Sequence, residues 1–211
     1  CAAPSAKKWY ANLNPTEDIN NIKNIVKNIS NLETDYFILI STVDVFSNPL
    51  NVDEDSPVVK EGLENYGTNR RYLELAIKKL FPHKNLIVRL PAVVGPGLKK
   101  NALFDIKHNN QMKKIDSRSK YQFYPTVNLW RDLVTSTKLN VDTVHLTAEP
   151  VSIKDIIKNC FLKNFHNETN DNFPNYDFRS KFASKMTGNN YYQYSKKDVF
   201  HAVRSYDQYS K

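Results

Sequence analysis

Leu39-Ile-Ser-Thr-Val-Asp-Val-Phe46 is the stretch that decides the fold, because it joins a long apolar run to a polar end. The continuous apolar run at residues 36–42 is typical of a strand that is covered on both faces of a parallel sheet. Such a strand would deliver the hydroxyl of Thr42 to its carboxyl end. Further along, Tyr66-Gly-Thr-Asn-Arg70 predicts the start of a helix that carries a phenol and, one turn later on the same face, a permanent cation.

The elements around these two stretches alternate between helix and strand. Asn14-Pro-Thr-Glu17 predicts a helix start that the side chain of Asn14 can cap, and an apolar stripe follows it at three- and four-residue spacing. We expect a second helix over residues 66–81 and a second strand over 86–90, which ends in the loop Pro91-Ala-Val-Val-Gly-Pro-Gly97. This alternation predicts a parallel α/β sheet.

The second half of the sequence is less regular. Residues 127–139 predict a helix and residues 143–147 a short strand. Ser152-Ile-Lys-Asp155 is a capping box that opens a helix, and Ser195-Lys-Lys-Asp198 caps the last one. Because neither an internal repeat nor a clear linker is visible, we expect a single domain.

Composition narrows the kinds of partner. The chain has 211 residues, a formal net charge of +8 and two cysteines, Cys1 and Cys160. The charge favours anionic partners, but the lysines are scattered, which weakens a nucleic-acid function. No apolar run approaches the roughly 18 residues of a membrane span, and no signal peptide is visible. We therefore expect a cytoplasmic protein that binds neither nucleic acid nor membrane, and no metal, because the histidines lack metal-ligand spacing.

The polar residues of the predicted sheet converge on one crevice. In a doubly wound sheet, ligands bind beyond the carboxyl ends of the strands. Thr42 lies at one such end, the loop at residues 91–97 at another, and Tyr66 begins the helix between them. A tyrosine has a pKa of about 10, and a nearby cation lowers it. The phenol, the cation and the hydroxyl can together move a proton on or off a carbinol oxygen while a hydride moves elsewhere.

These motifs resemble those of the extended short-chain dehydrogenase/reductase family, in particular its NAD-dependent epimerases, dehydratases and reductases of nucleotide sugars. The stretch at residues 40–46 resembles the family's Ser/Thr strand, and Tyr66-Gly-Thr-Asn-Arg70 resembles its YxxxK motif. Arg89-Leu-Pro-Ala-Val-Val-Gly-Pro-Gly97 resembles its RxxNVYGPG segment. The resemblance implies a partial Rossmann-like doubly wound parallel sheet. Residues 1–98 would form the C-terminal part of the NAD(P)-binding domain, and residues 99–211 a small α/β substrate-binding region interleaved with it.

The resemblance also implies roles for individual residues. Thr42 would hydrogen-bond the reacting sugar oxygen and Tyr66 would be the acid/base. Arg70 would lower the pKa of Tyr66 and bind the nicotinamide ribose, and Asn21 would support the active site. The cofactor, NAD or NADP, would be contacted by Ala2, Ala3, Tyr66, Arg70 and Pro91.

The sequence departs from the family pattern in several places. It has no glycine-rich loop, which in the family belongs to an N-terminal βαβ half that is missing here. Because the chain begins at Cys1 without a methionine, we expect a fragment of a longer protein, and tight cofactor binding would need the missing half. Arg70 stands where lysine is usual, Ala92 where asparagine is usual, and Asn128 where aspartate is common.

The sequence therefore predicts an NAD(P)-dependent epimerase or reductase that acts on a nucleotide-activated sugar. Dehydration is less favoured, since Val43-Asp44 stands where dehydratases carry Asp-Glu. The alternative is a non-catalytic relative that binds or scaffolds, which Arg70, Ala92 and the missing N-terminal half favour. The sugar, the nucleotide, the choice between NAD and NADP and the oligomeric state stay open, and a homodimer is compatible with the sequence.

Each candidate residue also has an ordinary structural explanation. Tyr66 and Arg70 alone could be a surface pair on a helix, and Thr42 could make a local hydrogen bond at a strand end. Asn21 lies in a helix rich in asparagine. Pairs of lysines are usually solvated, although four of them could meet substrate phosphates: Lys7, Lys8, Lys99 and Lys100.

Overall fold

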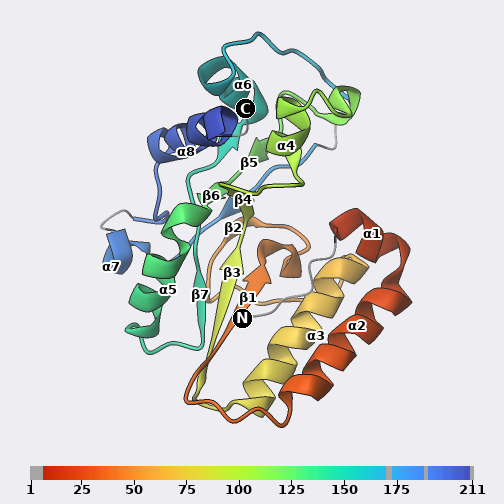
Figure 1. Cartoon of the computed structure of the whole chain (residues 1–211), viewed down its shortest axis with the longest axis vertical. Coiled ribbons are helices and arrows are strands. Elements are labelled where there is room, and N and C mark those ends of the chain that lie inside the picture. Colours follow the sequence, from red (N-terminus) through yellow and green to blue (C-terminus); the bar gives the residue numbers. More distant parts are fainter. Residues whose placement is uncertain (1–6, 170–172, 188–189, 210–211) are drawn as a thin grey trace.

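A three-stranded parallel sheet forms the centre of the protein (Figure 1). The computed structural model describes residues 7–169, 173–187 and 190–209. The strand order is β1 (Phe37–Thr42), β3 (Asn85–Leu90) and β7 (Thr143–His145). Thr42 lies opposite Leu90 in the register, so β1 and β3 end level with each other. The partial Rossmann-like sheet predicted from the sequence is confirmed.

Helices and loops cover this sheet on both faces, as the apolar strands predict. On one face, α2 (Pro15–Ile29) and α3 (Asn65–Leu80) pack side by side, with α1 (Lys8–Leu13) against both. Ile22 and Leu73 from these helices bury Leu39 and Ile87 of the strands. On the other face, a larger cluster of buried side chains runs from β3 through α5 (Leu129–Thr137) and α6 (Ile153–Cys160) to α8 (Lys196–Tyr209).

Short strand pairs and helices build the rest of the chain. Figure 1 shows α4, α6 and α8 grouped above the carboxyl ends of β1 and β3. Because the larger core cluster contains residues on both sides of position 98, the second half packs directly onto the sheet. The remaining elements are η1 (Val43–Val45), β2 (Leu50–Val52) paired with β9 (Asp177–Phe178), β4 (Ala92–Val94) paired with β6 (Phe123–Pro125), α4 (Ala102–Lys107), η2 (Met112–Lys114), β5 (Lys120–Tyr121) paired with β8 (Val151–Ser152), η3 (Thr126–Asn128) and α7 (Ala183–Thr187).

Most of the predicted elements are confirmed, with two local corrections. Ser152 caps α6 through a hydrogen bond from the Asp155 backbone N–H at 3.0 Å. The capping role predicted for Asn14 is wrong, because its side chain donates to the carbonyl of Tyr10 instead. The loop predicted after β3 contains β4, because that segment pairs with the distant β6. Among the helices of residues 7–169, 173–187 and 190–209, none has the length and apolar character needed to cross a bilayer.

A buried charge network ties the sheet to α3. The carboxylate of Glu74 is fully buried and accepts hydrogen bonds from Ser41 at 2.6 Å and from Arg89 at 2.9 Å. Arg89 also donates to Nε2 of His145 at 3.3 Å, which leaves Nδ1–H to donate to the carbonyl of Arg179 at 2.8 Å. His145 is therefore neutral, with its proton on Nδ1.

Acidification should destabilise the protein through His145. Burial and the adjacent Arg89 guanidinium hold the pKa of His145 well below its usual range. Below pH ~6.5 the unfolded chain binds one more proton at this residue, so the free energy of unfolding should fall by up to about 1.4 kcal/mol per pH unit. Urea unfolding between pH 7.5 and 5.5 measures this. Burial raises the pKa of Glu54, so this carboxyl makes the free energy of unfolding rise on acidification. It does so equally in the wild type and in the variant described next.

The matched variant for this prediction is His145→Gln. Glutamine keeps an acceptor for Arg89 and a donor for the Arg179 carbonyl, but it cannot be protonated. The variant should lose the part of the pH dependence that His145 contributes. If it and the wild type lost stability equally on acidification, His145 would not be the titrating group.

Candidate active site

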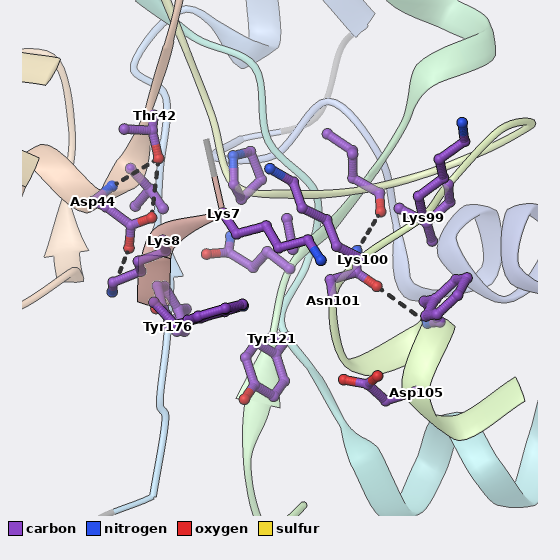
Figure 2. A pocket seen from close by; sticks show the side chains of 18 of the residues that line it. Lys7, Lys8, Thr42, Asp44, Lys99, Lys100, Asn101, Asp105, Tyr121 and Tyr176 are labelled. Atoms are coloured by element: carbon purple, nitrogen blue, oxygen red, sulfur yellow. Dashed lines mark hydrogen bonds and ion pairs between the residues drawn. The ribbon is translucent and has the colours of Figure 1, made fainter. Parts of the chain in front are cut away.

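A cavity of about 620 Å³ opens at the carboxyl ends of β1 and β3 (Figure 2). Thr42, Tyr66 and Pro91, which the sequence predicts to converge, all line it. Arg70 and Asn21 are not among its lining residues, and Ala2 and Ala3 lie outside the residues that the structure describes. The other lining residues come from α1, η1, β4, α4, β5 and the connecting segments: Lys7, Lys8, Trp9, Val43, Asp44, Ala92, Val93, Leu98, Lys99, Lys100, Asn101, Phe104, Asp105, Asn110, Gln111, Tyr121, Gln122 and Tyr176.

Thr42 is tied to the carboxylate of Asp44, which no sequence motif singles out. Its Oγ1 accepts the backbone N–H of Asp44 at 3.1 Å and donates to the Asp44 carboxylate at 3.2 Å. Lys8 binds the same carboxylate at 3.0 Å (Figure 2) and also reaches Glu64, the N-cap residue of α3, at 2.9 Å. The end of β1 and the starts of α1 and α3 are thus linked through charges, and Asp44 belongs to the site.

Tyr66 is brought to Thr42 by the close approach of α3 to η1. A Cβ on Gly67 would lie 2.1 Å from the carbonyl oxygen of Asp44, so only glycine allows the two segments to touch here. Asn12 of α1 accepts the Tyr66 backbone N–H at 2.8 Å and so satisfies one of the free donors of the first turn. The position of the first turn of α3, which carries Tyr66, is therefore set by α1 and η1 as well as by its own helix.

Burial, and not the neighbouring cation, dominates the protonation of Tyr66. Burial raises the pKa of its phenol above the ordinary value; Arg70 acts in the opposite direction but does not outweigh it, and Asp44 raises the pKa further. The lowered pKa that the sequence leads us to expect is thus reversed in sign. At neutral pH the phenol carries its proton and faces the cavity as a donor.

Arg70 lies behind Tyr66, bound to a carboxylate from α2. Its guanidinium reaches Asp18 at 3.0 to 3.3 Å and stands 4.3 Å from the centre of the Tyr66 ring. Asn69 donates to the same carboxylate at 2.9 Å. Asn21, in contrast, lies on the exposed side of α2. The sequence contains one indication that Asp18 points inward: it lies one turn before Ile22, in line with the apolar stripe of α2.

Cationic and aromatic side chains form much of the remaining wall. Lys7, Lys8, Lys99 and Lys100 all line the cavity (Figure 2). Burial, Arg70 and Lys7 together lower the pKa of Lys100, which is the direction that neighbouring positive charge imposes. Such a wall favours a ligand with negative charge.

An aromatic pair and a strained asparagine complete the site. Tyr121 and Tyr176 stack at 5.7 Å between ring centres and present flat apolar surface. Asn101 has a φ of +113°, which non-glycine residues rarely adopt. Its side chain caps α4 and donates to the carbonyl of Val93 at 2.8 Å. This conformation fixes the segment that carries Lys99 and Lys100.

Comparison with solved structures shows which proteins share this fold. No protein-family model and no curated protein matches the sequence. UDP-N-acetylglucosamine 4-epimerase from Methanobrevibacter ruminantium is similar with a TM-score of 0.76 and 13% identity, over 99% of this chain and 74% of that one. An NAD-dependent NDP-hexosamine 5,6-dehydratase of tunicamycin biosynthesis is similar with a TM-score of 0.74 and 15% identity, over 99% of this chain and 75% of that one.

A reductase is also similar in fold. dTDP-4-dehydrorhamnose reductase from Yersinia enterocolitica is similar with a TM-score of 0.69 and 14% identity, over 99% of this chain and 79% of that one. At such low identities the likeness concerns the fold. The chain has a partial Rossmann-like fold, which it shares with these solved structures over about three quarters of their length.

Proposed function

We propose that this cavity is the active site of an NAD(P)-dependent epimerase or reductase that acts on a nucleotide-activated sugar. One observation carries the proposal: Thr42, Tyr66 and the lysines line a single cavity beyond the carboxyl ends of parallel strands, where doubly wound folds bind their ligands. The similar structures add support, because their names include a UDP-sugar epimerase, an NAD-dependent dehydratase and a dTDP-sugar reductase.

The wall beside Tyr66 fits the nicotinamide end of such a cofactor. Pro91, Ala92 and Val93 contribute apolar surface to the cavity that Tyr66 and Thr42 also line, and a flat aromatic ring packs well on such a surface. When bound, the cofactor supplies hydride chemistry. The adenosine end would need contacts beyond those that the residues of this cavity offer.

Tyr66 and Thr42 would handle the oxygen of the sugar. In the direction of reduction, the Tyr66 phenol donates its proton to the carbonyl oxygen that becomes a hydroxyl; in the direction of oxidation, the proton returns to the phenolate. Thr42 holds the same oxygen by a hydrogen bond. Because burial raises the pKa of Tyr66, the phenol carries its proton at neutral pH. This is the form that carbonyl reduction requires.

The lysines next to Asn101 should contribute to the binding of the nucleotide's phosphates. Replacing Lys99 and Lys100 by glutamine should weaken the binding of a UDP- or dTDP-sugar about tenfold, since exposed charge pairs contribute up to about 1 kcal/mol each. The effect should shrink in high salt. Isothermal titration calorimetry measures it. The matched control is Lys113→Gln with Lys114→Gln, an exposed pair outside the cavity; equal weakening by both pairs would argue against a phosphate site.

A non-catalytic binding module is the second candidate. Two observations favour it: the Arg70 guanidinium is engaged by Asp18, and the Thr42 hydroxyl already donates to Asp44. A module of this kind would bind the same anionic, ring-containing ligand without converting it.

Turnover separates the two candidates. The protein is incubated with NAD(H) or NADP(H) and a panel of UDP- and dTDP-hexoses and their 4-keto forms. The absorbance of reduced nicotinamide is followed, and the sugar products are identified by NMR. We expect a change of sugar configuration or reduction of a keto sugar. Saturable binding without any conversion across the panel would support the binding module instead.

A further inference from the structure

A buried charge pair stands directly behind the candidate acid. The side chains of Arg70 and Asp18 are 3% and 4% exposed, and three N–O contacts between 3.0 and 3.3 Å join them. The pair bridges α3 and α2. Neither residue is among those that line the cavity, but the Arg70 guanidinium lies against the ring of Tyr66, which does line it.

This placement conflicts with a role of Arg70 on a cofactor ribose. A cation that binds ribose must present its donors to the cavity, as the lysine of the resembling motif would. Both terminal nitrogens of Arg70 donate instead to Asp18, and the guanidinium carbon lies 4.3 Å from the centre of the Tyr66 ring. Arginine in contact with a ring face stabilises the position of both groups.

We propose that Arg70 acts on Tyr66 and not on the cofactor, as a positioning residue that Asp18 holds against the phenol ring. The inference rests on the proposed function only in treating Tyr66 as the acid. The carboxylate offsets the charge of the guanidinium at short range, so the phenol receives mechanical support from Arg70 with only part of its electrostatic field. Asp18 is then as much a part of the catalytic arrangement as Arg70.

The charge groups that face Tyr66 predict how its titration should respond to substitution. Arg70 and Asp18 from the helices and Asp44 from η1 are the charges that act on the phenol. Removing Asp18 alone leaves the full field of Arg70, which should favour the phenolate. Removing Arg70 alone should favour the phenol. Removing both charges should raise the apparent pKa of Tyr66 slightly above its value in wild type.

The experiment is a pH titration of Tyr66 by 19F NMR in protein labelled with 3-fluorotyrosine. Tyr66→Phe identifies the resonance. Relative to wild type, Asp18→Asn should lower the apparent pKa of Tyr66 by about one unit, Arg70→Met should raise it, and the Asp18→Asn/Arg70→Met double variant should lie between wild type and Arg70→Met. Asp155→Asn, at an exposed position of α6, is the control and should not move the resonance.

The double variant keeps the test decisive because it leaves no unpaired buried charge, so it should fold even where a single variant does not. Two results would overturn the proposal: an equal pKa of Tyr66 in wild type and the double variant, or a pKa that is higher in Asp18→Asn than in wild type. The ion pair would then only hold α2 and α3 together. The titration needs neither cofactor nor substrate. If the protein showed no turnover but its variants gave the predicted order of Tyr66 pKa values, the proposed function would be refuted and this inference would stand.

Discussion

Replacing Tyr66 with phenylalanine should lower kcat for sugar conversion by at least about 100-fold, because general acid–base catalysis typically contributes 10²- to 10⁴-fold. The substitution removes only the phenol oxygen. The ring remains to pack against Arg70, whose guanidinium lies 4.3 Å from its centre, so the fold and the affinity for the nucleotide sugar should stay close to those of wild type. Steady-state kinetics with product detection by NMR measures the loss.

Tyr72→Phe is the matched control for this variant. Tyr72 lies on the same helix, is exposed and does not line the cavity, so its loss of a phenol oxygen should leave kcat unchanged. Full turnover in Tyr66→Phe would remove Tyr66 from the chemistry. Equal losses in both variants would point to a general effect on α3.

Replacing Glu74 with glutamine should destabilise the protein by about 3–5 kcal/mol, since removing one partner of a buried ion pair leaves the other charge uncompensated. The carboxylate is fully buried and binds Arg89 through both oxygens, while Arg71 and Ser41 also donate to it. A glutamine amide would turn two donors toward these guanidinium groups. A loss of this size is a large part of the 5–15 kcal/mol typical of a domain.

Urea unfolding of Glu74→Gln and of Glu61→Gln tests the network. Glu61 lies exposed before α3, and its substitution should change the free energy of unfolding by no more than about 0.5 kcal/mol. An unchanged midpoint for Glu74→Gln would mean that the network contributes little to stability. It would also weaken the view that Arg89 fixes the tautomer of His145.

The sheet, its flanking helices and the crevice were predictable because their signals are local. The apolar run before Thr42, the stripe of α2 and the start of α3 at Tyr66 each follow from a periodicity or a short motif. The level ends of β1 and β3 bring Thr42 and Pro91 to one cavity, and the start of α3 brings Tyr66 to it. The sequence predicts this convergence from parallel-strand geometry alone.

The residues that tune the site depend on contacts between distant segments. Asp18, Asn12 and Asp44 reach Arg70, Tyr66 and Lys8 only after α1, α2 and α3 have packed together. The family motif points to Asn21 and not to Asp18. In the folded chain, however, α2 turns the side that carries Asp18 inward. The direction of the Tyr66 pKa shift was wrong for the same reason: sequence reveals a nearby cation, whereas burial appears only in the folded chain.

Fluorescence of Trp9 tests most directly whether this cavity binds the proposed ligands. The protein has two tryptophans; Trp9 lines the cavity, and Trp130 is 76% exposed on α5 outside it. A Trp130→Phe variant therefore reports on the cavity alone. We predict a saturable change of Trp9 emission with a UDP- or dTDP-sugar, and energy transfer from Trp9 to bound NADH or NADPH. Binding detected by calorimetry without any change at Trp9, or no binding of either ligand, would contradict the assignment of this cavity.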